Sequence, residues 1–185
     1  MKKISKVPLK ALALMAILAA ISIILGKYLA IGIGEVLRFS FENLPIIFAG
    51  LIFGPLGGAA VGIVADLVGC VLVGYTINPI ITIGAAVIGA LSGLFRILFM
   101  RNTASPYSAV KITLTVILSH TVGSVIIKTF GLAAYYDMPF FILMLWRLLN
   151  YLIVGGLEAV LLYFLLKNKA VRREMAKFST PAEKR

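Results

Sequence analysis

Long apolar runs separated by short polar stretches dominate this chain. An α-helix needs roughly 20 apolar residues to cross about 30 Å of hydrocarbon, so runs of this length predict membrane-spanning helices. The pattern indicates an all-α membrane protein: a six-transmembrane-helix bundle forming one domain over residues 1–185, with a basic tail at 167–185 that is frayed or lies on the membrane surface. The expected spans are residues 9–30, 44–53, 56–73, 80–100, 109–130 and 139–166.

Two breaks shape the middle of the pattern. Gly54-Pro55 divides a long apolar region, because proline disfavours helical geometry in the residue before it. We therefore expect a short second helix, a tight turn and a third helix, the second being short for a full crossing. The run from Gly74 to Pro79 breaks the chain again.

The N-terminus permits two interpretations. Lys2, Lys3 and Lys6 followed by an apolar run are typical of a secretory signal peptide. The apolar run, however, continues beyond Gly26 to Ile33, which favours a first membrane span.

Composition agrees with a membrane protein. Hydrophobic residues make up 61% of the chain, charged residues 14%, and the mean hydropathy is +1.05, which excludes an ordinary soluble domain. The chain has 18 Lys and Arg against 7 Asp and Glu, concentrated at both ends and between the fourth and fifth spans. Because basic residues stay on the cytoplasmic side, both termini should be cytoplasmic, and nucleic acid is not needed as a partner.

The sequence lacks the residues needed for a disulfide, a metal site or ATP hydrolysis. The single cysteine, Cys70, excludes an internal disulfide, and with only one histidine, His120, the chain has no cluster typical of a metal site. Gly26-Lys27 is followed by Tyr28, so the phosphate-binding motif of ATPases is missing. We expect no cofactor, and any ATP hydrolysis would belong to another subunit.

Ionisable side chains inside spans need partners or a wet cavity. Arg147 lies near the outer end of the sixth span, and two interpretations remain open. It could form a structural salt bridge with Asp66 or Asp137, or it could anchor an anionic solute through paired hydrogen bonds. Helical spacing puts further residues on the same face, namely Asn150 or Tyr151, Val154 and the charged Glu158.

The fifth span carries a second polar stripe of His120, Ser124 and Lys128. Lys128 either faces the site or extends to the membrane surface, and an interhelical hydrogen bond is the favoured role for His120 over a proton relay. Small residues at steps of three or four predict close helix packing and a smooth face on the first span. They are Gly58 and Gly62, Ala85, Gly89 and Gly93, and Ala13, Ala16 and Ala20.

Several segments together resemble the substrate-binding S components of energy-coupling factor (ECF) vitamin transporters, folate family. The resemblance covers residues 9–167, and no segment is diagnostic singly. The segments are Leu37-Arg38-Phe39-Ser40-Phe41, Leu44-Pro45, Ala49-Gly50-Leu51-Ile52-Phe53-Gly54-Pro55, Ala65-Asp66-Leu67-Val68-Gly69 and Trp146-Arg147-Leu148-Leu149-Asn150-Tyr151-Leu152-Ile153.

The resemblance implies a protein of the bacterial plasma membrane that binds a vitamin with high affinity from outside. It then associates with a transmembrane T subunit and two cytoplasmic ATPases, and releases the vitamin inward. The resemblance assigns T-subunit docking to Ala13, Ala16 and Ala20. Taken together with the chemistry of folate, which has a pterin ring and a tail with two carboxylates, the resemblance indicates a set of substrate-binding residues. They are Arg147, Asn150, Tyr151, Trp146, Asn78, Asp66, Arg38, Glu42, Lys128, Tyr75 and Tyr136.

The vitamin is left open. After Asn78-Pro79 the chain continues directly into isoleucines, where folate binders tend to have a Gly- and aromatic-rich stretch. Folate, pantothenate or another anionic vitamin would suit the same side chains. Two other classes are an ion-driven carrier, for which no inverted repeat is evident, and an intramembrane hydrolase using His120, for which paired acids and a nucleophile motif are missing.

Overall fold

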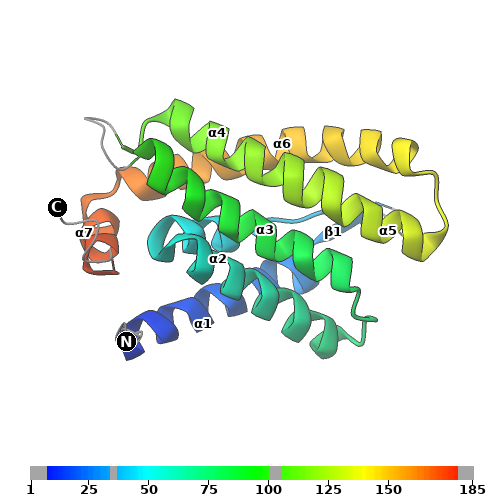
Figure 1. Ribbon diagram of the computed structural model, residues 1–185, viewed down its shortest axis with the longest axis horizontal. Helices are drawn as coiled ribbons and strands as arrows, with labels where there is room; N and C mark the ends of the chain where they lie inside the picture. Colours follow the sequence, from blue (N-terminus) through cyan, green and yellow to red (C-terminus); the bar gives the residue numbers. More distant parts are fainter. Residues whose placement is uncertain (1–7, 34–36, 101–105, 179–185) are drawn as a thin grey trace, which may run out of the picture.

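The computed structural model describes residues 8–33, 37–100 and 106–178. Long helices lie along a common direction, and a short helix, α7, lies across one end of the bundle (Figure 1). The all-α membrane fold is thereby confirmed. Within the described residues, five helical segments are long and apolar enough to span a membrane: Leu9–Tyr28, Asn43–Val73, Pro79–Met100, Ala109–Tyr135 and Phe140–Lys167.

Short π-helical stretches, labelled η, interrupt or end several of the helices. The elements are α1 (Leu9–Ile23), η1 (Ile24–Tyr28), β1 (Ile31–Ile33), β2 (Leu37–Phe39), α2 (Asn43–Val73), α3 (Pro79–Phe95), η2 (Arg96–Met100), α4 (Ala109–Ser119), η3 (His120–Ile127), α5 (Lys128–Tyr136), α6 (Phe140–Lys167) and α7 (Lys169–Phe178).

The helix count differs from six because the expected second and third helices are joined in α2. Gly54 breaks the helical geometry there with φ 81° and ψ −173°, a backbone conformation that only glycine adopts readily. A Cβ added to Gly58 would lie 2.7 Å from the Cα of Gly50, although eight residues of straight helix span about 12 Å. The chain therefore turns back on itself at Gly54, and α2 consists of two arms, 43–53 and 55–73.

The small-residue ridges pack against each other, as their spacing predicts. A Cβ on Gly58 would lie 2.3 Å from the carbonyl oxygen of Gly89, and one on Gly62 would lie 2.3 Å from that of Ala85. A Cβ on Gly93 would lie 2.3 Å from the carbonyl carbon of Gly54. Backbone thus meets backbone at these glycines of the α2–α3 interface, which leaves no space for a side chain at those positions.

A two-stranded antiparallel hairpin follows the first predicted span and occupies part of the predicted loop. The first helical segment ends at Tyr28, and β1 pairs with β2 in the register Ile31 with Phe39 and Gly32 with Arg38. Glycine and the short extended strands allow the chain to return into the bundle after the first crossing. The hairpin leads directly into the first arm of α2.

The basic tail is more ordered than its polarity indicates, and the expectation of a frayed segment is wrong for residues 169–178. They form α7, with Met175 only 3% exposed and Phe178 in edge-to-face contact with Phe53 at a ring separation of 5.5 Å. Apolar residues at steps of four and three, Val171, Met175 and Phe178, stabilise the helix against the bundle. The rest of the predicted tail, residues 179–185, lies outside the described part.

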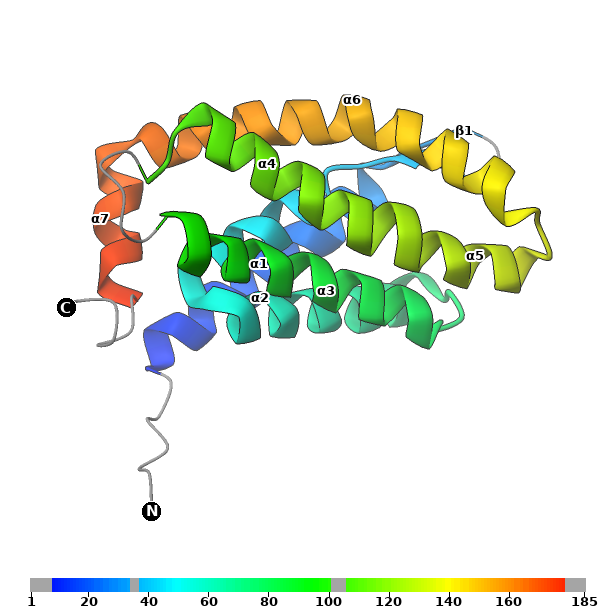
Figure 2. The same cartoon turned by 45° about the horizontal axis from the view of Figure 1, so that its top comes forward.

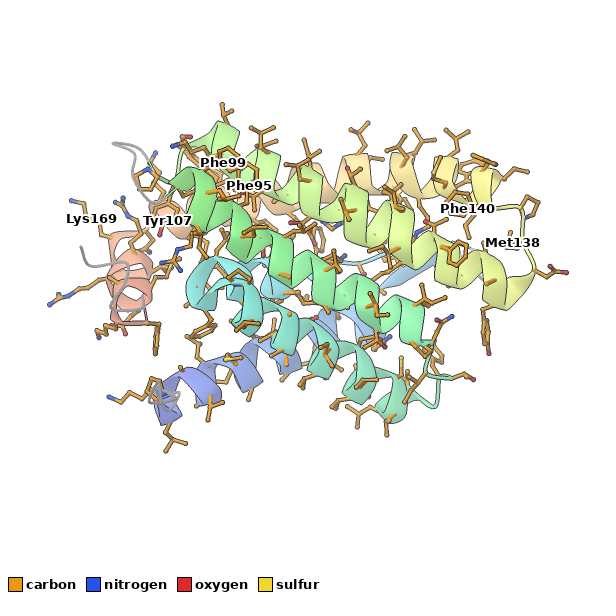
Figure 3. All side chains as sticks on the ribbon, in the orientation of Figure 1. Phe95, Phe99, Tyr107, Met138, Phe140 and Lys169 are labelled. Carbon is orange, nitrogen blue, oxygen red and sulfur yellow. The ribbon has the colours of Figure 1, made fainter. Side chains whose placement is uncertain are left out.

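Both described ends of the chain lie at the same end of the bundle (Figures 1 and 2). Lys169 of α7 marks this basic end, and Met138 and Phe140 lie at the opposite end (Figure 3). The charge rule applied to the sequence predicts that the Lys169 end is cytoplasmic and the Met138 end is the outer one.

Candidate functional site

A cavity of about 700 Å³ opens among the outer ends of the helices. This volume falls within the range of pockets that hold small organic ligands. The lining residues belong to η1, β1, α2, α3, α5 and α6 and to the segments that connect them. The lining residues are Gly26, Lys27, Ala30, Gly32, Ser40, Glu42, Asp66, Cys70, Tyr75, Thr76, Asn78, Ile81, Lys128, Leu132, Tyr135, Arg147 and Tyr151.

An ion pair between Glu42 and Lys128 joins the start of α2 to the start of α5. The Lys128 Nζ lies 2.8 Å from Oε1 of Glu42 and 3.4 Å from Oδ1 of Asn43. Gly26 makes room for this carboxylate, because a Cβ there would lie 2.7 Å from both Cβ and Oε2 of Glu42. Lys128 therefore reaches inward instead of extending to the membrane surface.

The same pair sets the protonation of Glu42. Burial alone would raise the pKa of Glu42, but the positive charges of Lys128, Lys27 and Arg147 outweigh burial and lower it from 4.5 to about 2. Glu42 is consequently a carboxylate throughout the physiological pH range, and it neutralises one of the cavity's cations.

Asp66 and Asn78 occupy the side of the cavity formed by α2 and α3. Thr82 donates a hydrogen bond of 2.6 Å to Oδ2 of Asp66. Asn78 caps α3 by accepting from the backbone N–H of Ile80, and its amide donates to the carbonyl of Gly131 at 2.9 Å. Asn78 thus has a structural role at the rim, whereas Asp66 keeps acceptor capacity for a ligand.

Arg147 projects from α6 into the cavity wall and is 8% exposed. Its Nε and Nη2 donate to the backbone carbonyl of Ser124 at 3.2 and 3.1 Å, and Nη2 donates to the hydroxyl of Tyr151 at 3.4 Å. In the described part of the chain these partners are neutral oxygens, not carboxylates, so the salt bridge with Asp66 or Asp137 is not formed. Within the described residues, no carboxylate is in direct contact with the guanidinium where it borders the cavity.

Lys27 is a third cation at the cavity, contributed by η1. Its Nζ lies 3.8 Å from Sγ of Cys70 and 5.6 Å from the ring centre of Tyr75. Sequence reasoning missed Lys27, treating it as an interruption of the first span. A lysine within one turn of a span's outer end, on the same side as Lys128 and Arg147, is the signal that could have found it.

The structure brings together seven of the eleven expected site residues. Those lining the cavity are Arg147, Tyr151, Asn78, Asp66, Glu42, Lys128 and Tyr75.

The other four do not line it in the described part of the chain. Trp146 is 55% exposed on the outside of α6, and Asn150 is buried on the face of Arg147 but deeper in the bundle. The backbone of Arg38 pairs with Gly32 in the hairpin, and the side chains of Arg38 and Tyr136 lie outside the described part. Tyr135, next to Tyr136, contributes to the lining.

The arrangement is suited to binding. Three cations, two carboxylates and three tyrosines face one space, so a flat molecule that carries both an anionic group and hydrogen-bond donors would find partners on each side. Arg147 offers positive charge from α6, whereas Lys27 lies against Cys70, one turn of α2 from the acceptor Asp66.

The fold has well-matched counterparts among solved structures. FolT bound with folic acid superposes with a TM-score of 0.71 at 24% identity, covering 88% of this chain and 95% of that chain. The S component of a bacterial ECF transporter gives 0.63 at 22% identity, covering 91% and 96%. An S component for biotin from an ECF-type ABC transporter gives 0.61 at 22% identity, covering 86% and 92%. At these identities the likeness establishes the fold.

Family membership comes from the sequence itself. A search among curated proteins finds no match. The family model for the substrate-specific component of ECF transporters, however, matches residues 10–166, which is most of the chain and the whole helical bundle up to the end of α6. The resemblance inferred from the motifs is confirmed, and the chain belongs to the family of ECF transporter substrate-specific components.

Proposed function

We propose that this protein captures folate, or a chemically related anionic vitamin, with high affinity from the outer side of the bacterial plasma membrane. The observation that carries the proposal is the convergence of Arg147, Lys27 and Lys128 on one cavity of about 700 Å³ that also contains Asp66. Since Glu42 offsets Lys128 through their ion pair, the remaining positive charge favours an anionic ligand.

The chemistry of folate matches this distribution of charge. Its carboxylates suit the guanidinium of Arg147, which can donate two parallel hydrogen bonds, and the ammonium of Lys27. The amine and ring N–H groups of the pterin suit the carboxylate of Asp66, and the flat rings suit Tyr75, Tyr135 or Tyr151. Pantothenate shares the carboxylate but lacks the aromatic ring, so the tyrosines favour folate.

We further propose that α1 docks the T subunit of the transporter. Ala13, Ala16 and Ala20 are all exposed on α1, between larger exposed residues such as Ile17. A face of small residues allows another membrane helix to approach closely. The T subunit would be joined by two cytoplasmic ATPases, since the sequence has no phosphate-binding motif of its own.

A vitamin panel tests the proposal. Purified protein in lipid nanodiscs is heated with folic acid, pantothenate, biotin or thiamine, and the unfolding midpoint is recorded by tryptophan fluorescence. A ligand present at a hundred times its Kd stabilises the folded state by about 2.7 kcal/mol, so folic acid should give the largest upward shift. A shift with pantothenate alone would reassign the vitamin, and no shift with any anionic vitamin would overturn the proposal.

A further inference from the structure

A buried polar network lies behind the cavity, deeper in the bundle than any lining residue. Glu158 of α6 is 0% exposed and His120 of η3 is 2% exposed. The Oε2 of Glu158 lies 2.5 Å from Nε2 of His120, which joins two helices 38 residues apart in sequence. Ionisable groups inside a membrane protein are costly, so their retention calls for a role.

The histidine connects this pair to a serine and a tyrosine. Its Nδ1 lies 3.1 Å from Oγ of Ser124, and its ring stacks on the ring of Tyr151 at 4.6 Å with an interplanar angle of 26°. With the Nε2–H directed at Oε2 of Glu158, Nδ1 pairs with the hydroxyl of Ser124. Two hydrogen bonds and the stacking on Tyr151 therefore hold the ring in place.

The same serine and tyrosine hold the arginine of the cavity. Arg147 donates to the backbone carbonyl of Ser124 and to the hydroxyl of Tyr151, and its guanidinium carbon lies 5.3 Å from the ring centre of Tyr151. Ser124 lies in the π-helical stretch η3, whose altered backbone spacing is a recurrent feature of functional sites. Within the described residues, the hydrogen bonds of Arg147 thus go to two residues that His120 also contacts.

We infer that His120 and Glu158 are positioning residues for Arg147, acting from Glu158 through His120 to Ser124 and Tyr151. The inference rests on the proposed role of Arg147 as the contact for a ligand's anionic group. His120 and Glu158 do not line the cavity and do not touch the ligand. They fix the partners of the guanidinium, so that its remaining donors point into the cavity before the ligand arrives, which reduces the ordering cost of binding.

Chemical modification of Arg147 tests this inference without any vitamin. Phenylglyoxal is added to the protein in nanodiscs, and the rate of adduct formation at Arg147 is followed by peptide mass spectrometry. Glu158→Leu removes the acceptor for His120, while Glu158→Gln keeps an acceptor oxygen of the same reach. The matched control is Thr115→Val on α4, a position that is 1% exposed, where the lost hydroxyl donates to the carbonyl of Lys111 within the same helix.

We expect Glu158→Leu to raise the modification rate about tenfold, the factor equivalent to a lost hydrogen bond to a charged group. Glu158→Gln should restore a rate within about threefold of the original, because the amide oxygen still accepts from Nε2. His120→Phe, which keeps the stacking on Tyr151 but loses both nitrogens, should fall between them. An unchanged rate in Glu158→Leu and His120→Phe, or an equal rise in Thr115→Val, would overturn the inference.

Affinity for folic acid is then measured in the same variants. Glu158→Leu should weaken it about tenfold in the native background and leave it unchanged in an Arg147→Ala background, because non-additivity marks residues that act through one another. Equal weakening in both backgrounds would contradict the inference. If folic acid binds none of the proteins, the proposed function fails, and the modification rates still decide whether Arg147 is positioned by Glu158.

Discussion

Two helix pairs of this bundle are held together in opposite ways. Between α2 and α3, glycines bring backbone against backbone, as at Gly58 and Gly89, where an added Cβ would lie 2.1 to 2.3 Å from the facing carbonyl oxygen. Between η3 and α6, buried polar side chains meet instead, as at His120 and Glu158. One contact depends on the absence of side chains, and the other on particular functional groups.

The difference teaches where each half of the protein tolerates change. An interface of glycines is intolerant of added volume but has no chemistry to lose, because its contacts are van der Waals contacts. A polar interface tolerates a change of shape at its edges but depends on each donor and acceptor being matched. The cavity lies where these two kinds of interface meet, with Asp66 on one side and Arg147 on the other.

Adding volume to the glycine interface should have the largest effect. Gly89→Val would place a Cβ 2.1 Å from the carbonyl oxygen of Gly58, so the two helices must separate. We expect a loss of more than about 3 kcal/mol in folding free energy, at or beyond the upper end of overpacking costs, seen as a large drop in unfolding midpoint. Gly156→Ala on α6, where a Cβ meets nothing within 4 Å, is the control. A Gly89→Val protein as stable as this control would refute backbone packing.

Removing the guanidinium from the polar side should leave the fold intact and affect binding. We expect Arg147→Ala to weaken binding of the anionic vitamin by about 2 kcal/mol, roughly thirtyfold, because a buried carboxylate loses its charged donor. Isothermal titration in nanodiscs measures the change. Leu149→Ala, at a position 49% exposed on the same helix, should bind as the native protein does. Equal affinities for both variants would remove Arg147 from the site.

Acidification should weaken the ion pair between Glu42 and Lys128. The pKa of Glu42 is lowered from 4.5 to about 2, so its stabilising contribution is complete above about pH 4.5 and is lost as pH falls toward 2. At neutral pH we expect Glu42→Gln to be less stable than the native protein by the order of 1 to 2 kcal/mol. Thermal unfolding from pH 7 to pH 2.5 should bring the two curves together. A gap that stays constant with pH would contradict the assignment.

The smallest effect on stability is expected on α1, outside both interfaces. Leucine at both Ala16 and Ala20 should change the unfolding midpoint and the vitamin affinity little, since both alanines are exposed on the bundle surface. Copurification with T subunit and ATPases should nevertheless be lost, because bulky side chains prevent close helix approach. The matched change Leu152→Ile, at a position 72% exposed on α6, should leave copurification intact. Intact complexes with the double variant would move the docking face elsewhere.

The glycine-rich interface between α2 and α3 was easier to predict from the sequence than the polar interface between η3 and α6. Glycine at four-residue steps, as in Gly58 and Gly62, has one common explanation in membrane helices, and the structure confirms it. The shared face of Arg147 and Glu158 on α6 followed equally directly from helical periodicity. Both predictions depend only on spacing within one helix.

Contacts between distant segments could not be predicted in this way. Periodicity places Lys128 on a helix face but cannot indicate that Glu42, 86 residues earlier, lies opposite it. The position of Lys27 near the end of its span could be predicted, but its contact with Cys70 arises only when the first span packs on α2. The helical order of α7 was, in contrast, available from Val171, Met175 and Phe178, whose spacing is amphipathic within a strongly basic segment.

The reversal at Gly54 has a consequence for how far a solute must still travel. The arm before it, residues 43–53, is 11 residues long and covers about 16 Å, roughly half of the 30 Å hydrocarbon layer. Because this arm ends at the basic end of the bundle, Glu42 at its start is set back from the outer ends of the longer helices, and the non-helical backbone that leads to it borders the pocket. Under the proposed function, a molecule resting against Glu42 would therefore already have covered part of the crossing from the outer surface, before any movement of the bundle.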